Sequence, residues 1–183
     1  MVALASRSRR HGSRAPARSA AILALVFPCI LPAAASGATC AIEHARYALR
    51  QTPGYTADFA SRTPTPDWPA DVLFVIHSAH TGKTYVFLPY SGNGAGVTTH
   101  LASVTDPAHP PGPDGPPSAR PLGDMDYVAA DEAYVFDQRF WAHAGAAAPA
   151  HLLIQDLQAA LWYRTDPRET VPVAFFDLVG CTP

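Results

Sequence analysis

The sequence has little charge and no long apolar run. Charged residues make up 15% of the 183 residues, and the formal net charge at pH 7 is −2. The longest apolar stretch, residues 20–31, contains Pro28 and is shorter than the roughly 20 residues that a membrane-spanning helix needs. We therefore expect no membrane span after signal cleavage. The composition is also too even for a collagen, a coiled coil or a disordered acidic tail.

Acidic residues are missing from the first 38 residues, which hold five of the 13 basic residues and none of the 15 acidic ones. An Arg/Ser-rich start, the apolar run and the small residues of 33–38 follow one another, which is the layout of a secretory signal peptide. A mitochondrial transit peptide is the alternative, but the clear apolar block favours export, by the general or the twin-arginine route. We predict a signal peptide at 1–38, one globular domain at 39–183, and a periplasmic or secreted protein.

The predicted domain is acidic and contains few cysteines. Removing the signal leaves 13 − 5 = 8 basic residues against 15 acidic ones, and this balance argues against nucleic acid as a partner. Of the three cysteines, Cys29 lies in the signal, so the domain keeps Cys40 and Cys181. Exported proteins meet an oxidising compartment, so we predict a disulfide between these two. A metal or nucleophilic thiol is the alternative, but neither cysteine has a second ligand at metal spacing.

Strand patterns dominate the first half of the domain. Residues 71–78 and 83–90 are β-branched and aromatic, the turn 79–82 lies between them, and a third strand pattern covers 97–105 after Asn93-Gly94. Short turns between such segments predict an antiparallel meander. Because the first two strands are apolar on both faces, each face of the sheet must be covered. Residues 41–51 show apolar residues at helical spacing, which predicts an N-terminal helix.

The second half begins with a proline-rich stretch. Residues 106–121 contain seven prolines and two glycines, which predicts an exposed, extended loop. Beyond it we expect short strands near 125–130, 134–136 and 151–154, a brief helix from Asp156 through Tyr163, and a closing strand at 171–179. The predicted fold class is α+β, mostly β: an antiparallel meander sheet covered by a short N-terminal helix and C-terminal elements, with the termini joined by a disulfide.

No complete catalytic motif is present. Gly82-Lys83-Thr84 and the glycines of 92–96 resemble parts of phosphate-binding loops, but strand patterns flank them where a helix is required, so both are interpreted as turns. His77, His80 and His100 are candidate zinc or copper ligands only if the turn brings them together. Asp124, Asp126, Asp131 and Glu132 form an acidic cluster that suits a solvated rim or, less well, acid–base chemistry. We assign no catalytic residue and expect no cofactor.

Aromatic residues on loops suggest binding, because loop aromatics commonly anchor interfaces. The candidates are Trp68, Tyr85, Phe140 and Trp141. We hypothesise an exported, non-enzymatic domain that binds a protein or other ligand of the cell envelope or outside the cell. A small extracytoplasmic hydrolase, metal-dependent or carboxylate-based, is the alternative.

One short stretch resembles a known family. Residues 81–85, Thr-Gly-Lys-Thr-Tyr, are similar to the Ser-Gly-x-x-Tyr loop of periplasmic lysozyme inhibitors, with Thr in place of Ser. The resemblance implies a small, exported, disulfide-linked β protein. It covers five residues, and we transfer no site residue from it.

Overall fold

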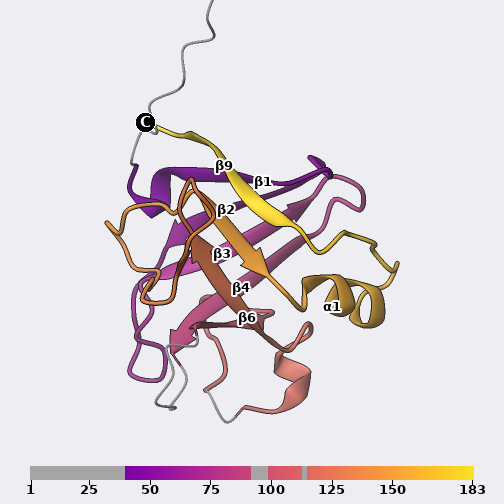
Figure 1. Ribbon diagram of the computed structural model, residues 1–183. Helices are drawn as coiled ribbons and strands as arrows, with labels where there is room; N and C mark the ends of the chain where they lie inside the picture. The colour runs from indigo at the N-terminus through magenta and orange to yellow at the C-terminus, as the bar shows by residue number, and fades with distance from the viewer. Residues whose placement is uncertain (1–39, 92–98, 113–114) are drawn as a thin grey trace, which may run out of the picture. The chain divides into compact units, whose positions relative to one another are not determined.

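The sheet closes on itself. In this computed structural model, which describes residues 40–91, 99–112 and 115–183, eight strands form an antiparallel barrel (Figure 1). Each strand pairs with the next along the barrel, and the pairings β5–β6 and β9–β1 complete the ring. The barrel strands are β1 (Ala45–Leu49), β2 (Tyr55–Ser61), β3 (Val72–Ser78), β4 (Thr84–Ser91), β5 (Thr99–Val104), β6 (Asp124–Ala130), β8 (His151–Ile154) and β9 (Phe175–Cys181).

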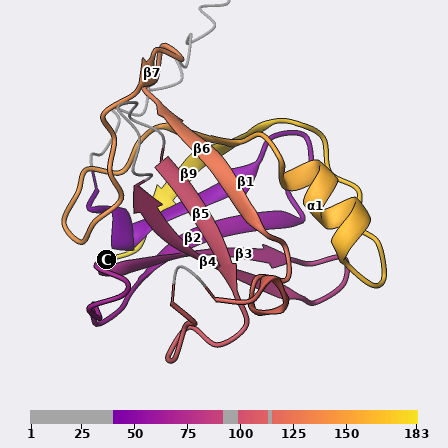
Figure 2. The same ribbon diagram turned by 90° about the horizontal axis from the view of Figure 1, so that it is seen from below.

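The remaining elements are short. Strand β7 (Phe136–Asp137) pairs with the end of β6, and the helix α1 (Leu157–Arg164) lies outside the barrel (Figure 2). Two 3-10 turns, η1 (Ile42–His44) and η2 (Pro117–Ala119), complete the list. In the part of the chain that the structure describes, no helix is both long enough and apolar enough to cross a membrane.

The expectation of a mostly β, antiparallel fold is confirmed, but two of its details are wrong. The sheet is a closed barrel rather than an open meander, and the predicted helix at 41–51 is the turn η1 followed by strand β1. Ala45, Tyr47 and Leu49 are buried while Arg46 between the first two is exposed, which is the two-residue period of a strand. Pairing with β2 and β9 overrides the helix propensity of this alanine-rich segment.

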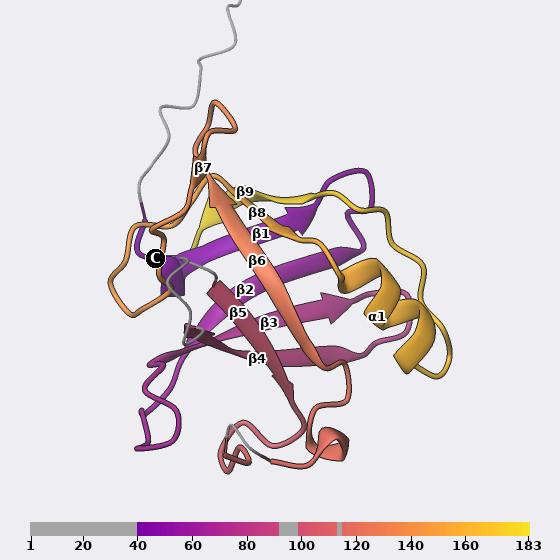
Figure 3. The same ribbon diagram turned by 60° about the horizontal axis from the view of Figure 1, so that its bottom comes forward.

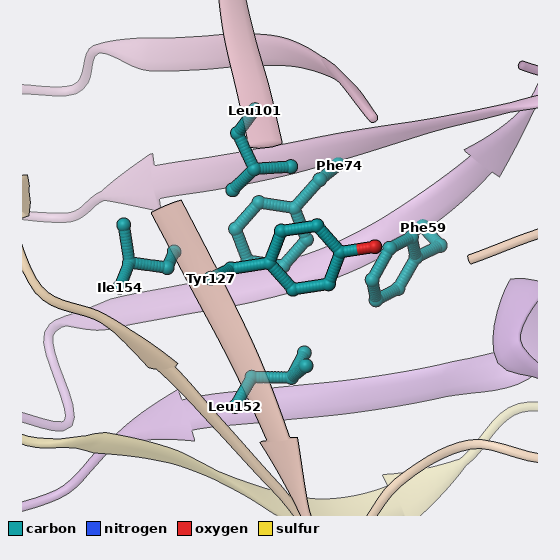
Figure 4. Close-up of a pocket in the computed structure, with 6 residues that line it drawn as sticks. All are labelled: Phe59, Phe74, Leu101, Tyr127, Leu152 and Ile154. Atoms are coloured by element: carbon teal, nitrogen blue, oxygen red, sulfur yellow. The ribbon is translucent and has the colours of Figure 1, made fainter. Parts of the chain in front are cut away.

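Aromatic and aliphatic side chains fill the barrel. Phe59 and Phe74 lie with ring centroids 5.0 Å apart, and Phe74 also contacts the rings of Phe87 and Phe176. Figure 4 shows the gap that remains among six of the interior side chains. This gap is too small to hold a water molecule. Eight-stranded barrels either hold a small ligand or are filled by their own side chains, and this one is filled.

The outer face of β3, β4 and β5 is covered by the chain itself. Leu73, Val75 and Leu88 point outward and pack against Trp68. The Trp68 indole Nε1 donates a hydrogen bond to the Pro111 carbonyl oxygen at 2.7 Å, so the proline-rich stretch lies over this face. Both faces of these strands are thus covered, the inner one by the barrel interior and the outer one by Trp68 and the loop that it binds.

The predicted disulfide is confirmed. Cys40 and Cys181 are bonded, with their Cα atoms 6.1 Å apart, and the link joins the start of the described chain to the end of β9. The predicted short helix after Asp156 and the closing strand are also present, the latter beginning at Phe175. The predicted signal peptide at 1–38 lies outside the described residues.

Candidate binding surface

The outer face of β1, β9 and β8 carries aromatic and charged side chains in cross-strand rows. His151 on β8 lies opposite Asp177 on β9, and Leu153 lies opposite Phe175. The side chains of Leu153, Phe175 and Asp177 are half-buried. No stretch comparable to the proline-rich loop covers them among the described residues. This face therefore differs from the outer face of β3–β5, because its apolar side chains remain partly in contact with solvent.

The turn between β6 and β7 adds the most exposed aromatics. The Asp131 carboxylate accepts hydrogen bonds from the backbone N–H groups of Ala133 and Val135, both at 2.9 Å. Tyr134 has a φ of 62°, a left-handed conformation that is strained for a bulky residue. The turn thus holds Tyr134 in one orientation at the tip of a hairpin that projects beyond the barrel (Figure 3).

The rings around this hairpin stack on one another. The Tyr134 ring is parallel to the His151 imidazole, with centroids 4.1 Å apart and an interplanar angle of 10°. Phe175 contacts both Tyr134 and Phe136. Tyr134, Val135 and Phe136 are 44%, 64% and 51% exposed. We call Tyr134, Val135, Phe136, His151 and Phe175 the aromatic surface.

An ion pair between Arg50 and Asp177 lies beside the aromatic surface and orients its side chains. The Arg50 guanidinium donates to both Asp177 carboxylate oxygens, at 2.8 Å from Nε and 2.6 Å from Nη2. The guanidinium also lies over the rings of Tyr134 and Phe175. The hydrogen bonds from Arg50 hold the pKa of Asp177 below its ordinary value, partial burial opposes this, and His151 adds to the lowering. Such bidentate and stacked contacts orient side chains before any partner arrives.

The four aromatics predicted as a binding surface lie elsewhere. Trp68 is buried under the proline-rich stretch, and Phe140 is half-buried with its ring 6.3 Å from that of Tyr127. Trp141 and Tyr85 are half-buried as well. None of the four belongs to the aromatic surface.

The candidate metal-binding histidines bond to different partners. His77 on β3 lies opposite Thr84 at the start of β4, whereas His100 on β5 lies opposite Tyr90 near its end. Six residues of strand separate these positions, about 20 Å. His80 is exposed in the turn between β3 and β4. Among residues 40–91, 99–112 and 115–183, no group of three or more metal-ligand side chains is present.

His77 has the neighbours of a catalytic base. Its Nδ1 lies 3.2 Å from the Thr84 hydroxyl and its Nε2 lies 3.1 Å from the Asp58 carboxylate. A nucleophile, a base and an orienting carboxylate are connected in this way in hydrolases. Here the three lie on the outer face of neighbouring strands, with the His77 and Asp58 side chains 45% and 41% exposed. Their strand amides are committed to the ladder, so they are unavailable to stabilise an oxyanion.

The acidic cluster after the proline-rich stretch is also divided. Asp124 accepts from Arg120, Asp126 lies 2.5 Å from the His100 Nδ1, and Asp131 holds the hairpin turn. Glu132 is exposed on the same turn. Each of the first three carboxylates therefore has its own local partner. The arrangement brings no two of them together through a shared contact.

A buried carboxylate that the sequence did not indicate fixes the turn between β3 and β4. Glu169 is 1% exposed and accepts hydrogen bonds from the hydroxyls of Tyr55, Ser78, Thr81 and Tyr85. Burial alone would raise the pKa of Glu169, but the four hydroxyl donors outweigh it and the pKa is lowered. The carboxylate is thus ionised and saturated with donors, which suits a structural anchor better than an acid–base group.

Gly82-Lys83-Thr84 forms the turn that was expected, with Gly82 at a φ of 70°. The Gly82 N–H donates to the Ser78 carbonyl oxygen at 2.9 Å, and the Lys83 ammonium donates to the Asp166 carbonyl oxygen. The segment that resembles the lysozyme-inhibitor loop therefore contains the end of this turn and the first two residues of β4, and Lys83 connects it to the loop that carries Glu169. The glycines of 92–96 lie outside the described residues.

In comparisons with known proteins, the chain matches no family model, no curated protein and no solved structure. The aromatic surface must therefore be judged on its own geometry. Sequence reasoning missed it because its members come from three separate segments. The one available signal was the run Tyr134-Val135-Phe136 beside turn-forming residues, which marks either a buried strand or an exposed apolar tip.

Proposed function

We propose that this chain is an exported, non-enzymatic domain that binds a protein partner through the aromatic surface. The observation that carries the proposal is the exposure of Tyr134, Val135 and Phe136 on a hairpin already fixed by Asp131 and Arg50. Tyr and Arg are enriched among the residues that dominate protein–protein affinity. A side chain held in place before binding loses less entropy when the partner docks.

The shape of the surface favours a protein over a small molecule. Small-molecule sites are concave and enclose most of their ligand, whereas this hairpin projects from the barrel (Figure 3). Among the described side chains inside the barrel, the gap beside Tyr127 has no room for a ligand. The disulfide agrees with the proposed periplasmic or secreted location, because such bonds persist in oxidising compartments.

The test places a photo-crosslinking amino acid at position 135, with position 80 in the exposed turn between β3 and β4 as the control. We expect a crosslink to an envelope or secreted protein at position 135 that is absent at position 80. With that partner purified, Phe136→Ala should weaken binding about tenfold or more, equivalent to about 1.4 kcal/mol.

The control for folding is the melting temperature, which Phe136→Ala should leave nearly unchanged because the side chain is 51% exposed. The assignment of this surface would be refuted if crosslinks formed with equal yield at both positions. It would also be refuted if Phe136→Ala left the affinity for the partner unchanged. A crosslink only to a second copy of the chain would replace the partner by a homodimer.

A further inference from the structure

A second feature of the surface lies along α1, apart from the β6–β7 hairpin (Figure 2). A pocket of about 320 Å³ is lined by the helix and by the start of β6. Leu122, Met125 and Ala160 are buried and form its apolar floor, and Tyr163, 78% exposed, forms a wall. Its volume is within the range of small-molecule sites, about 300–1,000 Å³. A smaller pocket of about 240 Å³ lies on the other side of Tyr163.

The pocket contains the Arg164 guanidinium, which lies close to Gly123. Gly123 has a φ of 77°, and a Cβ at this position would lie 2.7 Å from the Arg164 Nη1. The guanidinium thus lies close to the Gly123 backbone, at the end of an exposed and flexible side chain. Within the described parts of the chain, the Arg164 side chain has no ion pair and no hydrogen bond. A guanidinium without a carboxylate partner can bind one from a ligand.

The opposite end of the pocket contains a free carboxylate. Asp156 precedes α1, and its side chain makes no capping hydrogen bond. It is exposed and has no ion-pair partner in the ranges that the structure describes. The third charged side chain of the lining, Asp124, is already bound by Arg120. The pocket thus offers one negative and one positive group to a ligand, at its two ends.

The spacing of these charges sets the length of a matching ligand. Asp156 and Arg164 are eight residues apart on a helix, which is about 12 Å of axial rise. Long side chains on a helix point back toward its N-terminus, so the distance from guanidinium to carboxylate is shorter. An extended peptide spans about 3.3–3.6 Å per residue, and three residues with charged ends fit. The helix dipole opposes this arrangement, but it amounts to only about half an elementary charge at each helix end. The full charges of Asp156 and Arg164 are larger, so they determine the orientation of the peptide.

We propose that the α1 pocket binds a short peptide of about three residues with free ends. Its ammonium group pairs with Asp156, its carboxylate pairs with Arg164, and an apolar side chain packs on Tyr163 above Met125 and Ala160. This site is separate from the aromatic surface and does not depend on the function proposed for it.

The test is calorimetric titration of the purified protein with alanyl-phenylalanyl-alanine, its N-acetylated form and its C-amidated form. We expect each blocked peptide to bind at least tenfold more weakly than the free one. Arg164→Gln should remove the difference between the acid and the amide, and Asp156→Asn the difference between the amine and the acetylated form. Each variant should therefore lose its preference for one free end of the peptide and keep its preference for the other free end.

The matched control is Arg168→Gln, because Arg168 lies over the Trp162 ring outside this pocket and should leave affinity unchanged. Melting temperatures establish that all variants fold, and Phe136→Ala should bind the peptide like the unmodified protein. The proposal is overturned by no binding at millimolar peptide, by equal affinity for the blocked peptides, or by preferential binding of a neutral trisaccharide used as a comparison ligand.

Discussion

At the scale of single residues, Glu169 shows how a polar side chain can organise an apolar fold. Tyr55 and Ser78 are 3% and 2% exposed, and both donate to the same Glu169 oxygen. A buried hydroxyl without an acceptor costs about 1–3 kcal/mol. Sequence reasoning had no means to find this residue, because its donors come from β2, β3, the following turn and β4, and only the fold brings them to the loop after α1.

We predict that Glu169→Ala lowers the free energy of unfolding by about 3 kcal/mol, because it strands the Tyr55 and Ser78 hydroxyls. Glu169→Gln should lower it by about 1–2 kcal/mol, since one acceptor oxygen remains. Urea denaturation measures both. Glu132→Gln, on an exposed turn residue, is the control and should be neutral. A Glu169→Ala protein as stable as this control would contradict the anchoring role.

The pH dependence of stability has a definite sign for Glu169. Its folded pKa lies below the ordinary 4.5, so its contribution is fully present above pH 4.5 and is lost as the pH falls through the lowered value. We expect the unmodified protein to lose more stability than Glu169→Ala between about pH 7 and pH 3. Parallel denaturation series for the two proteins test this. Equal losses would show that another carboxylate governs acid unfolding.

At the scale of elements, the barrel could be predicted in part. The strands β3, β4 and β5 contain β-branched and aromatic runs, which are strong signals. Strand β2 was missed although Tyr55, Ala57 and Phe59 alternate with less buried residues, because its Ala and Asp residues are poor strand formers. The segment of β1 satisfies both a helical and a strand period. Only the pairing partners decide between them, and these partners are not visible locally.

The cover over the outer face of β3–β5 should depend on one side chain. Trp68 is 2% exposed, packs on this face and binds Pro111. We predict that Trp68→Ala lowers the free energy of unfolding by about 3–5 kcal/mol, as for other buried large-to-small changes. Trp162→Ala, on a tryptophan that is 41% exposed, should cost less than about 1 kcal/mol. Thermal denaturation of both variants compares them, and similar costs would mean that the face is stable without its cover.

At the scale of the whole molecule, the disulfide and the β1–β9 pairing that closes the barrel join the same two ends of the described domain. Cys40 and Cys181 are separated by 141 residues, so in the chain-entropy model the bond stabilises the fold by about 5 kcal/mol. Replacing both cysteines by serine should lower the free energy of unfolding toward that amount. The denaturant m-value should rise, because the unfolded chain expands. Unchanged stability and m-value would show that the bond does not restrict the unfolded state.

The candidate binding sites belong to this largest scale, which is why the sequence indicated so little of them. The aromatic surface combines residues 134–136 of the hairpin with His151 on β8 and Phe175 on β9, and the α1 pocket combines Asp156 and Arg164 with the start of β6. Each set meets only after the ring closes. The disulfide, by contrast, followed from counting cysteines, since two of them allow one pairing.

The sulfur link between the ends has a consequence for damage to the backbone. A single cut by a peptidase near His109 would divide the chain into a piece with β1–β5 and a piece with β6–β9. The pieces would stay covalently joined through Cys40 and Cys181 and paired along two separate seams, β5–β6 and β9–β1. Under denaturing conditions the nicked molecule would therefore migrate as one species until a reductant separates its halves.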